Sequence, residues 1–242
     1  MSNKKSEQLN ANSRAISTLA IILIVVVVVG AVVATVVFFL WFWPFGRVVG
    51  SENLVTKEKD FSDFTIVEVG SGFEVEITQS SSYSINITAD DNVFDYIEAS
   101  KTGDTLTIRL KWGYIVQSAT LRAEITMPHL YELKFSGGTH GTAEGFTSSH
   151  DFVLNLSGGS TINLEGSAND LRISASGGSH VHLSDFTVHN ADVNLSGGSD
   201  ATITLDGRLD ADLSGGSDLL YIGEPTLGDI NTSGGSTVGK KQ

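Results

Sequence analysis

The stretch FVLNLSGGSTINLEG, Phe152–Gly166, places a Ser-Gly-Gly-Ser motif between two runs of alternating apolar and polar residues. The motif, with Thr once in the last position, begins at residues 136, 157, 176, 196, 214 and 233, so it recurs every 18 to 21 residues. A regular period of this length is the sequence signature of a repeat architecture. Alternation with a period of two is typical of strands with one buried face, and none of these runs is patterned as a helix.

A repeat of two or three short strands cannot bury its apolar face alone, so the repeats are expected to stack. The predicted fold is all-β: a single-stranded β-helix, or solenoid, with coils of about 20 residues. A sharp corner in each coil explains the glycine pairs, because Gly adopts positive φ without steric penalty. Ser hydroxyls stacked at these corners would satisfy backbone groups at the bend. The predicted structural corner glycines are Gly137, Gly138, Gly158, Gly159, Gly177, Gly178, Gly197, Gly198, Gly215, Gly216, Gly234 and Gly235. A phosphate-binding function for these glycines would require a following helix, whereas a strand-like run follows each pair.

A long apolar segment precedes the repeats. Residues 15–46 contain no charged side chain, and the run from Ile16 to Trp43 exceeds the roughly 20 residues that span a bilayer. Trp41 and Trp43 stand at its end, where interfacial aromatic residues are expected. The segment predicts one N-terminal transmembrane helix. The alternatives are a cleaved signal peptide, with residues 32–34 as the cleavage site, and cleavage near Arg14 after a leader that resembles archaeal pilin signals. The second alternative would leave the helix in place.

The remaining chain divides by pattern. We expect a short cytoplasmic tail at 1–14, the anchor at 15–46, a juxtamembrane linker at 47–60, an N-terminal β section that caps the solenoid at 61–135, the repeats at 136–236 and a flexible tail at 237–242. Residues 44–242 carry 12 basic and 27 acidic side chains, a formal charge of −15. This acidity argues against a nucleic-acid partner. The predicted location is the cell membrane, single-pass, with the C-terminal domain extracytoplasmic. Four sequons give candidate glycosylation sites at Asn86, Asn155, Asn194 and Asn231.

The order of several stretches resembles a known family. FTIVEVGSGFEVEITQ (64–79), GDTLTIRL (103–110), LRAEITMPHLYELKFSGGTH (121–140) and the repeated LSGGS resemble the putative adhesin family called the head GIN domain, which is similar to the adhesin-like "toastrack" β-helices. The resemblance covers roughly residues 61–236. It implies a β-helical envelope domain with adhesin-like binding, and it brings no catalytic residues to this chain.

Candidate residues for chemistry occur mainly in the last repeats. Five carboxylates gather there in the sequence: Asp200, Asp206, Asp210, Asp212 and Asp218. A glycosidase needs two carboxylates at a set separation, one of them with a raised pKa. His180 and His182 alternate on one predicted strand, with His189 further on, and two His at this spacing can hold a metal. The GGSD stretches at Gly197 and Gly215 lack the pattern of calcium-binding repeats. We expect solvated surface residues in all these positions, and therefore no catalytic, cofactor or metal site.

Three functions remain open. The first is a membrane-anchored, extracytoplasmic, non-enzymatic domain that binds a glycan or another cell-surface ligand in the manner of an adhesin. The second is a structural or regulatory module of the envelope that docks on a host membrane protein, which predicts an exposed apolar patch. The third is a carbohydrate-active β-helix enzyme, which predicts a groove lined by paired carboxylates.

Overall fold

The computed structural model describes residues 25, 28–29, 32–33 and 46–241. It divides into two units, Met1–Gly46 and Arg47–Gln242. The predicted cytoplasmic tail lies outside the described residues, as does most of the predicted membrane helix. Residues 25, 28–29 and 32–33 are helical. Among the residues that the structure describes, no helix is both long enough and apolar enough to cross a membrane.

Residues 47–241, the described part of the second unit, contain β-strands and one short 3₁₀ helix, η1 (Phe94–Tyr96). The strands before the first Ser-Gly-Gly corner are β1 (Gly46–Val49), β2 (Leu54–Glu58), β3 (Ile66–Val69), β4 (Glu74–Gln79), β5 (Ser84–Asp90), β6 (Ile97–Thr102), β7 (Thr105–Leu110), β8 (Tyr114–Gln117), β9 (Leu121–Met127) and β10 (Glu132–Phe135). The strands after it are β11 (His140–Thr147), β12 (Phe152–Leu156), β13 (Thr161–Ser167), β14 (Asp170–Ala175), β15 (His180–Val188), β16 (Asn190–Leu195), β17 (Asp200–Leu205), β18 (Arg208–Leu213), β19 (Asp218–Ile222), β20 (Thr226–Thr232) and β21 (Thr237–Lys240).

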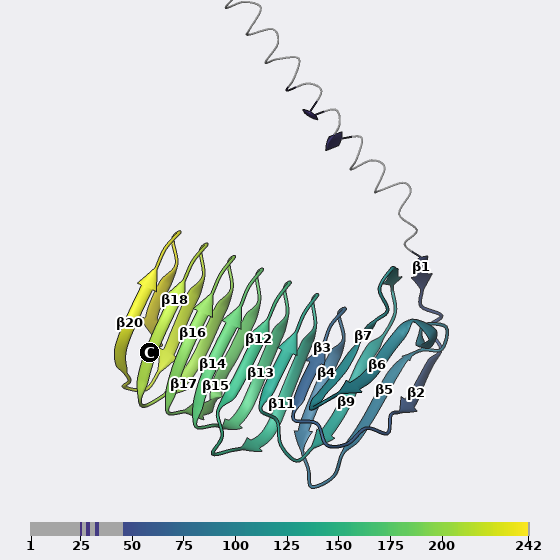
Figure 1. Cartoon of the computed structure of the whole chain (residues 1–242), viewed down its shortest axis with the longest axis horizontal. Coiled ribbons are helices and arrows are strands. Elements are labelled where there is room, and N and C mark those ends of the chain that lie inside the picture. Colours follow the sequence, from purple (N-terminus) through teal and green to yellow (C-terminus); the bar gives the residue numbers. More distant parts are fainter. Residues whose placement is uncertain (1–24, 26–27, 30–31, 34–45, 242) are drawn as a thin grey trace, which may run out of the picture. The chain divides into compact units, whose positions relative to one another are not determined.

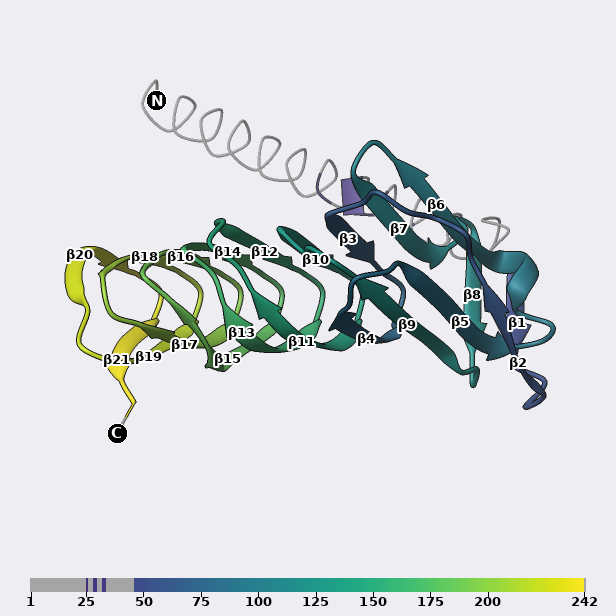
Figure 2. The same ribbon diagram turned by 90° about the horizontal axis from the view of Figure 1, so that it is seen from below.

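The strands form two large sheets that face each other, and β1 and β8 form a separate two-stranded sheet. The nine-stranded sheet has the order β20-β18-β16-β14-β12-β10-β3-β7-β6, and the ten-stranded sheet has the order β2-β5-β9-β4-β11-β13-β15-β17-β19-β21. From β10 onward the chain enters the two sheets alternately, and each strand pairs in parallel with the equivalent strand of the next coil. Figure 1 shows the stacked coils, and Figure 2 shows the two sheets as two layers. The predicted β-solenoid is confirmed in this coarse form, with two strands in each coil.

The core lies between the two sheets. Alternate residues of each strand point inward, and the parallel register places equivalent residues of successive coils on top of one another. Leu154, Ile173 and Val193 form one such row in the nine-stranded sheet, and all three are fully buried. The same apolar core continues through the section at 61–135, which packs Phe64, Phe73 and other buried residues into it.

Each Ser-Gly-Gly corner joins a strand of the nine-stranded sheet to a strand of the ten-stranded sheet. The first glycine of each pair has φ between 63° and 68°, and the second has φ between 74° and 83°. The residue after the pair is fully buried in five of the corners, and its hydroxyl donates a hydrogen bond to the carbonyl oxygen three residues earlier at 2.8–2.9 Å. These residues are Thr139, Ser160, Ser179, Ser199 and Ser217. In these five corners the second hydroxyl residue of the motif therefore satisfies the backbone at the bend, whereas in the last corner the first residue, Ser233, donates to the Leu213 carbonyl at 3.4 Å.

The section before the repeats contains one further corner of this kind. Ser71 and Gly72 have φ of 70° and 77°, and a Cβ atom on Gly137 would lie 3.3 Å from the Ser71 backbone nitrogen. Ser71 thus occupies the position of a first corner glycine. The corner ladder begins one coil before the first Ser-Gly-Gly motif.

Two predicted segments differ from the structure. Residues 47–60, expected as a linker, contain most of β1 and all of β2, and β2 pairs antiparallel with β5 at the edge of the ten-stranded sheet. Its Lys57 and Glu58 are exposed, which is typical of protected sheet edges and conceals the strand pattern in the sequence. Residues 237–240, expected in a flexible tail, form β21 because their backbone continues the ladder on β19.

Candidate ligand groove on the nine-stranded sheet

The five aspartates that gather in the sequence do not form one cluster. Asp200 and Asp218 are register partners in the ten-stranded sheet, whereas Asp210 and Asp212 lie on β18 in the other sheet. Asp206 lies in the turn between β17 and β18. Each coil contributes one strand to each sheet, so residues that are close in the sequence can lie on opposite outer faces of the solenoid. The carboxylates therefore do not line a single catalytic groove.

The histidines are surface residues in the described part of the chain. His180 and His182 are both exposed on β15 and point away from the core, as the alternation predicts. His180 Nδ1 contacts Asp200 of the next coil, and His189 Nδ1 lies 2.8 Å from an Asp206 oxygen. Among the residues that the structure describes, no three His, Asp or Glu side chains come together as metal ligands.

Three of the four sequons lie in one row on the outer face of the nine-stranded sheet. The row runs through Asn155, Ser174, Asn194, Asp212 and Asn231 as successive register partners. Asn155 is half-buried, and its amide donates a hydrogen bond of 2.9 Å to Glu132 Oε1. The fourth sequon, Asn86, lies on β5 of the ten-stranded sheet.

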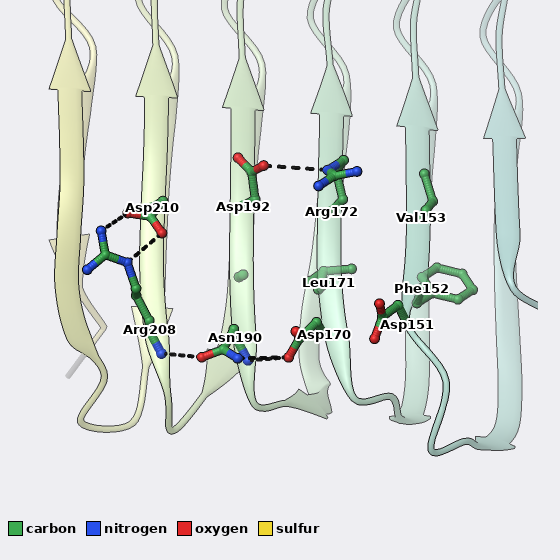
Figure 3. A pocket seen from close by; sticks show the side chains of 11 residues that line it. Asp151, Phe152, Val153, Asp170, Leu171, Arg172, Asn190, Asp192, Arg208 and Asp210 are labelled. Carbon is green, nitrogen blue, oxygen red and sulfur yellow. Dashed lines mark hydrogen bonds and ion pairs between the residues drawn. The ribbon is translucent and has the colours of Figure 1, made fainter.

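Two hollows adjoin on the outer face of the nine-stranded sheet. One, of about 410 Å³, lies over the beginnings of β12, β14, β16 and β18, with Val153, Arg172, Asp192 and Asp210 among its lining residues. The other, of about 420 Å³, lies over the ends of β12, β14 and β16 and extends to the serines of the corners. We call the first hollow the Arg–Asp groove. Figure 3 shows its side chains across neighbouring strands.

Arg172, Arg208 and four aspartates line the Arg–Asp groove, and two arginine–aspartate pairs form among them. Arg172 Nε lies 3.4 Å from Asp192 Oδ2 on the next strand. The Arg208 guanidinium donates two hydrogen bonds of 2.7 Å to the two oxygens of Asp210, which is the bidentate geometry that planar guanidinium groups favour (Figure 3). Both arginines are about half-exposed or more, and the Arg208 guanidinium also lies 3.6 Å from Asp229 Oδ2. The groove thus presents charged donors and acceptors at the spacing of neighbouring strands, about 4.8 Å.

A second set of polar contacts fixes the lower edge of the groove. The Asn190 side chain donates a hydrogen bond through Nδ2 to Asp170 Oδ1 at 2.9 Å, and its Oδ1 accepts one from the Arg208 backbone N–H at 2.8 Å (Figure 3). Asn169 donates in the same way to Asp151 at 2.8 Å. These hydrogen bonds join consecutive coils, so the side chains that line the groove are held in place before a ligand arrives.

The electrostatics of Asp210 oppose acid catalysis. Hydrogen bonds from the Arg208 side chain, and then from the backbone N–H of Asp229, hold the pKa of Asp210 below its ordinary value. A glycosidase acid needs a raised pKa. Asp210 therefore serves as a permanent hydrogen-bond acceptor at neutral pH.

Arg172 and Arg208 are not among the residues that the sequence pattern singled out. Each is an outward residue of a strand in the nine-stranded sheet; only the register shows that Arg172 meets Asp192, whereas Arg208 and Asp210 are two residues apart on β18 and share a face by alternation alone. Nor did the pattern single out Asp90, which is almost fully buried and accepts hydrogen bonds from the backbone N–H groups of Glu52 at 2.6 Å and Thr120 at 2.8 Å. The Ala-Asp-Asp-Asn stretch that ends the β5 strand pattern was the available signal for this position.

Comparison with known proteins identifies one family. Residues 63–225 match the model of the family described as "Putative auto-transporter adhesin, head GIN domain". None of the curated proteins matches the chain.

Solved structures share the fold. A putative adhesin from Bacteroides fragilis NCTC 9343 matches with a TM-score of 0.67 at 19% identity, over 80% of this chain and 100% of that one. A putative adhesin from Parabacteroides merdae ATCC 43184 matches with a TM-score of 0.51 at 19% identity, over 81% and 100%. A putative lipid binding protein from Parabacteroides distasonis ATCC 8503 matches with a TM-score of 0.51 at 18% identity, over 81% and 100%.

Proposed function

Because the chain belongs to the family of putative auto-transporter adhesins with a head GIN domain, we propose that it is a cell-surface, non-enzymatic binding protein. The proposal places the β-solenoid outside the cell, held by the apolar segment at residues 15–46. Its ligand is a glycan or another polar molecule of a cell surface. The family name supports the adhesive function, and the groove supports the chemistry of the ligand.

The observation that carries the proposal is the pre-arranged row of arginine, aspartate and asparagine side chains in the Arg–Asp groove. Arg172 and Asp192 lie on adjacent strands with most of each side chain exposed. Sugar hydroxyl groups both donate and accept hydrogen bonds. A surface that alternates guanidinium and carboxylate groups therefore matches them, and the half-exposed Val153 offers an apolar contact within the same hollow.

The test uses the labelled full chain in lipid nanodiscs, offered to intact cells and to immobilised glycans. We expect saturable binding that Arg172→Ala weakens about tenfold or more, because a hydrogen bond to a charged group contributes about 1.5–3 kcal/mol. The matched control is His182→Ala, an exposed residue on the ten-stranded sheet, which should leave binding unchanged. Equal loss in both variants, or no binding to either target, would contradict the proposal.

A second candidate function has one observation in its favour. A docking module of the envelope predicts an exposed apolar patch, and Trp112, Tyr114 and Ile115 are exposed apolar side chains close together in the sequence. In that case the chain would capture one membrane protein of its own host and would not bind cells. Offering the same labelled chain to solubilised host membranes separates the two functions.

A carbohydrate-active enzyme is the least supported candidate. Its predicted carboxylates are divided between the two sheets, and the pKa of Asp210 is shifted in the direction opposite to that of a catalytic acid. The release of new reducing ends from a bound glycan would revive this candidate.

A further inference from the structure

The second hollow on the outer face of the nine-stranded sheet is lined mainly by neutral polar side chains. We call this hollow, of about 420 Å³, the Asn–Ser hollow. Glu68 and Lys134 are the charged residues that line it, and their charges are opposite. The surface of the Asn–Ser hollow is therefore close to neutral, although the outer domain as a whole is strongly acidic. Its polar side chains on β12, β14, β16 and the corners that follow these strands are Asn155, Ser157, Ser174, Ser176, Asn194 and Ser196.

Strand alternation brings these side chains to one face. Each of the three strands ends with an Asn or Ser that stands two residues before a corner Ser, and residues at this spacing face the same side of a strand. The residue between them is buried in the core in all three strands. The register then sets Asn155, Ser174 and Asn194 beside one another, at the strand spacing of about 4.8 Å. The Asn–Ser hollow therefore offers two rows of amide and hydroxyl groups, one on the strands and one at the corners.

Most of these polar groups have no hydrogen-bond partner within the described part of the chain. Asn155 is the exception, because its amide donates to Glu132 Oε1 at 2.9 Å. The Asn194 amide and the hydroxyls of Ser174 and Ser196 form no hydrogen bond with any protein group that the structure describes. The charged groups of the Arg–Asp groove, in contrast, are bonded to one another. A ligand therefore replaces water in the Asn–Ser hollow without first breaking a contact within the protein.

The two hollows adjoin along the strands. Arg172 and Ser174 stand two residues apart on β14, as do Asp192 and Asn194 on β16, so the members of each pair face the same side about 6.7 Å apart. Figure 3 shows Arg172 and Asp192, which lie on the groove side of this boundary. Each hollow has a volume within the range of about 300–1,000 Å³ that is typical of small-molecule sites. Together they accommodate a ligand larger than a single sugar unit.

The neutrality of this surface selects among the polar ligands of a cell surface. Phosphate and other anions are bound by clustered Arg and Lys, and Ca²⁺ is bound by clustered carboxylates, whereas the residues that line the Asn–Ser hollow form neither cluster. Sugar hydroxyls both donate and accept hydrogen bonds, as do Ser hydroxyls and Asn amides.

From this chemistry and from the adjoining position, we propose that the Asn–Ser hollow is a second subsite for the glycan of the Arg–Asp groove. The glycan is a linear oligosaccharide that extends from the groove toward the corners, and its units in the Asn–Ser hollow are uncharged. The inference rests on the proposed function and deepens it, because it names the class of the ligand and assigns contacts to Ser174, Asn194 and Ser196.

The experiment offers neutral linear oligosaccharides of increasing length to the full chain in lipid nanodiscs. The chain is produced in a host without N-glycosylation, so that the sequon residues Asn155 and Asn194 are unmodified. The probes are β-1,4-linked oligomers of glucose, mannose and N-acetylglucosamine with two, four or six units, and binding is measured by calorimetry. We expect at least one series to bind, and its tetramer to bind about tenfold or more tightly than its dimer, because only the longer chain reaches both hollows. Tetragalacturonate, an anionic oligomer of the same length, should bind more weakly than the neutral tetramer.

A double variant, Ser174→Ala with Asn194→Ala, removes a neighbouring hydroxyl and amide from the Asn–Ser hollow. Both side chains are exposed and point away from the core. We expect the affinity for the tetramer to fall about tenfold or more, and the affinity for the dimer, which binds in the Arg–Asp groove, to change less than about twofold. The matched control is Thr142→Ala with Asn163→Ala, two outward register partners on the ten-stranded sheet, which should change neither affinity.

Two single variants separate an effect on binding from an effect on folding. Asn194→Asp keeps the size of the side chain and removes its N–H donors, so the affinity for the tetramer should fall about threefold. Ser196→Ala should weaken tetramer binding to a similar degree while the midpoint of urea unfolding stays unchanged.

The contrary outcomes distinguish this inference from the proposed function. Equal affinity for two, four and six units would show that the ligand occupies one hollow only. Unchanged tetramer binding in the double variant, with binding still lost in Arg172→Ala, would remove the second subsite and leave the proposed function intact. Tighter binding of tetragalacturonate than of every neutral tetramer would show that the ligand is anionic and would overturn the inference. Absence of glycan binding by the parent chain would contradict the proposed function, and the inference with it.

Discussion

Replacing Gly177 by Ala tests whether the stacked corners need glycine for its backbone conformation, for space, or for both. Gly177 and Gly178 are neighbours in one corner, with φ of 68° and 74°. A Cβ atom on Gly177 would lie 3.2 Å from the backbone nitrogen of Gly158 in the preceding coil, whereas a Cβ atom on Gly178 would meet nothing within 4 Å. The pair therefore separates the two requirements within one turn.

The magnitudes follow from these geometries. A residue with a side chain in the left-handed region costs about 1–2 kcal/mol, and the reduced freedom of the unfolded chain returns about 0.4–1 kcal/mol. We therefore expect Gly178→Ala to lower the free energy of unfolding by about 1 kcal/mol. Gly177→Ala should lower it by about 1 kcal/mol more, because the new methyl group presses on backbone that cannot rotate away.

The assay is urea unfolding of the full chain in mild detergent, followed by the circular dichroism of the β-sheets. Gly178→Asn is the control for backbone conformation, because Asn adopts positive φ more readily than Ala. It should therefore be less destabilising than Gly178→Ala. If Gly178→Ala destabilises the protein as much as Gly177→Ala, the contact between coils has no energetic weight and the reasoning from space is refuted. If neither has any effect, the reasoning from φ is refuted as well.

Three further predictions concern a corner, the core and the groove. Ser199→Ala should lower the free energy of unfolding by about 1–3 kcal/mol, because its buried hydroxyl donates to the Ser196 carbonyl at 2.8 Å and that carbonyl would lose its partner. Ser196→Ala, in the more accessible first position of the same corner, should be nearly neutral in the same urea titration. Leu154→Ala, fully buried in the middle of the core row, should cost about 2–5 kcal/mol, and a loss below 1 kcal/mol would contradict the assigned packing. Asp210→Asn should shift the urea midpoint downward at pH 7 but not at strongly acidic pH. The hydrogen bond from Arg208 lowers the pKa of Asp210 in the folded protein below 3.8, so its stabilisation is present above that value and is lost as the pH falls through the folded pKa. A difference between variant and parent that persists in acid would refute the role given to this pair.

The sequence by itself determined the repeat, the two-residue alternation and the position of each corner. These features are local, because a strand alternates its side chains whatever its partner, and a corner requires glycine through its own φ angle. The prediction of stacked coils from residue 136 onward needed only this information. Strands at the edges of the stack were missed: Lys57 and Glu58 conceal β2, and β21 follows the last corner with only Val238 packed against the core.

Only the tertiary structure decided which side chains meet. Asp200 and Asp210 are ten residues apart, yet they lie on opposite sheets, while Arg172 and Asp192 are twenty residues apart and lie side by side. In a two-sheet solenoid, proximity follows the register between coils and not distance along the chain. The Arg–Asp groove, the coil that begins at Ser71 and the buried carboxylate of Asp90 all depend on that register. A single coil in the sequence does not encode them, because each is made by the contact of one coil, or one edge strand, with another.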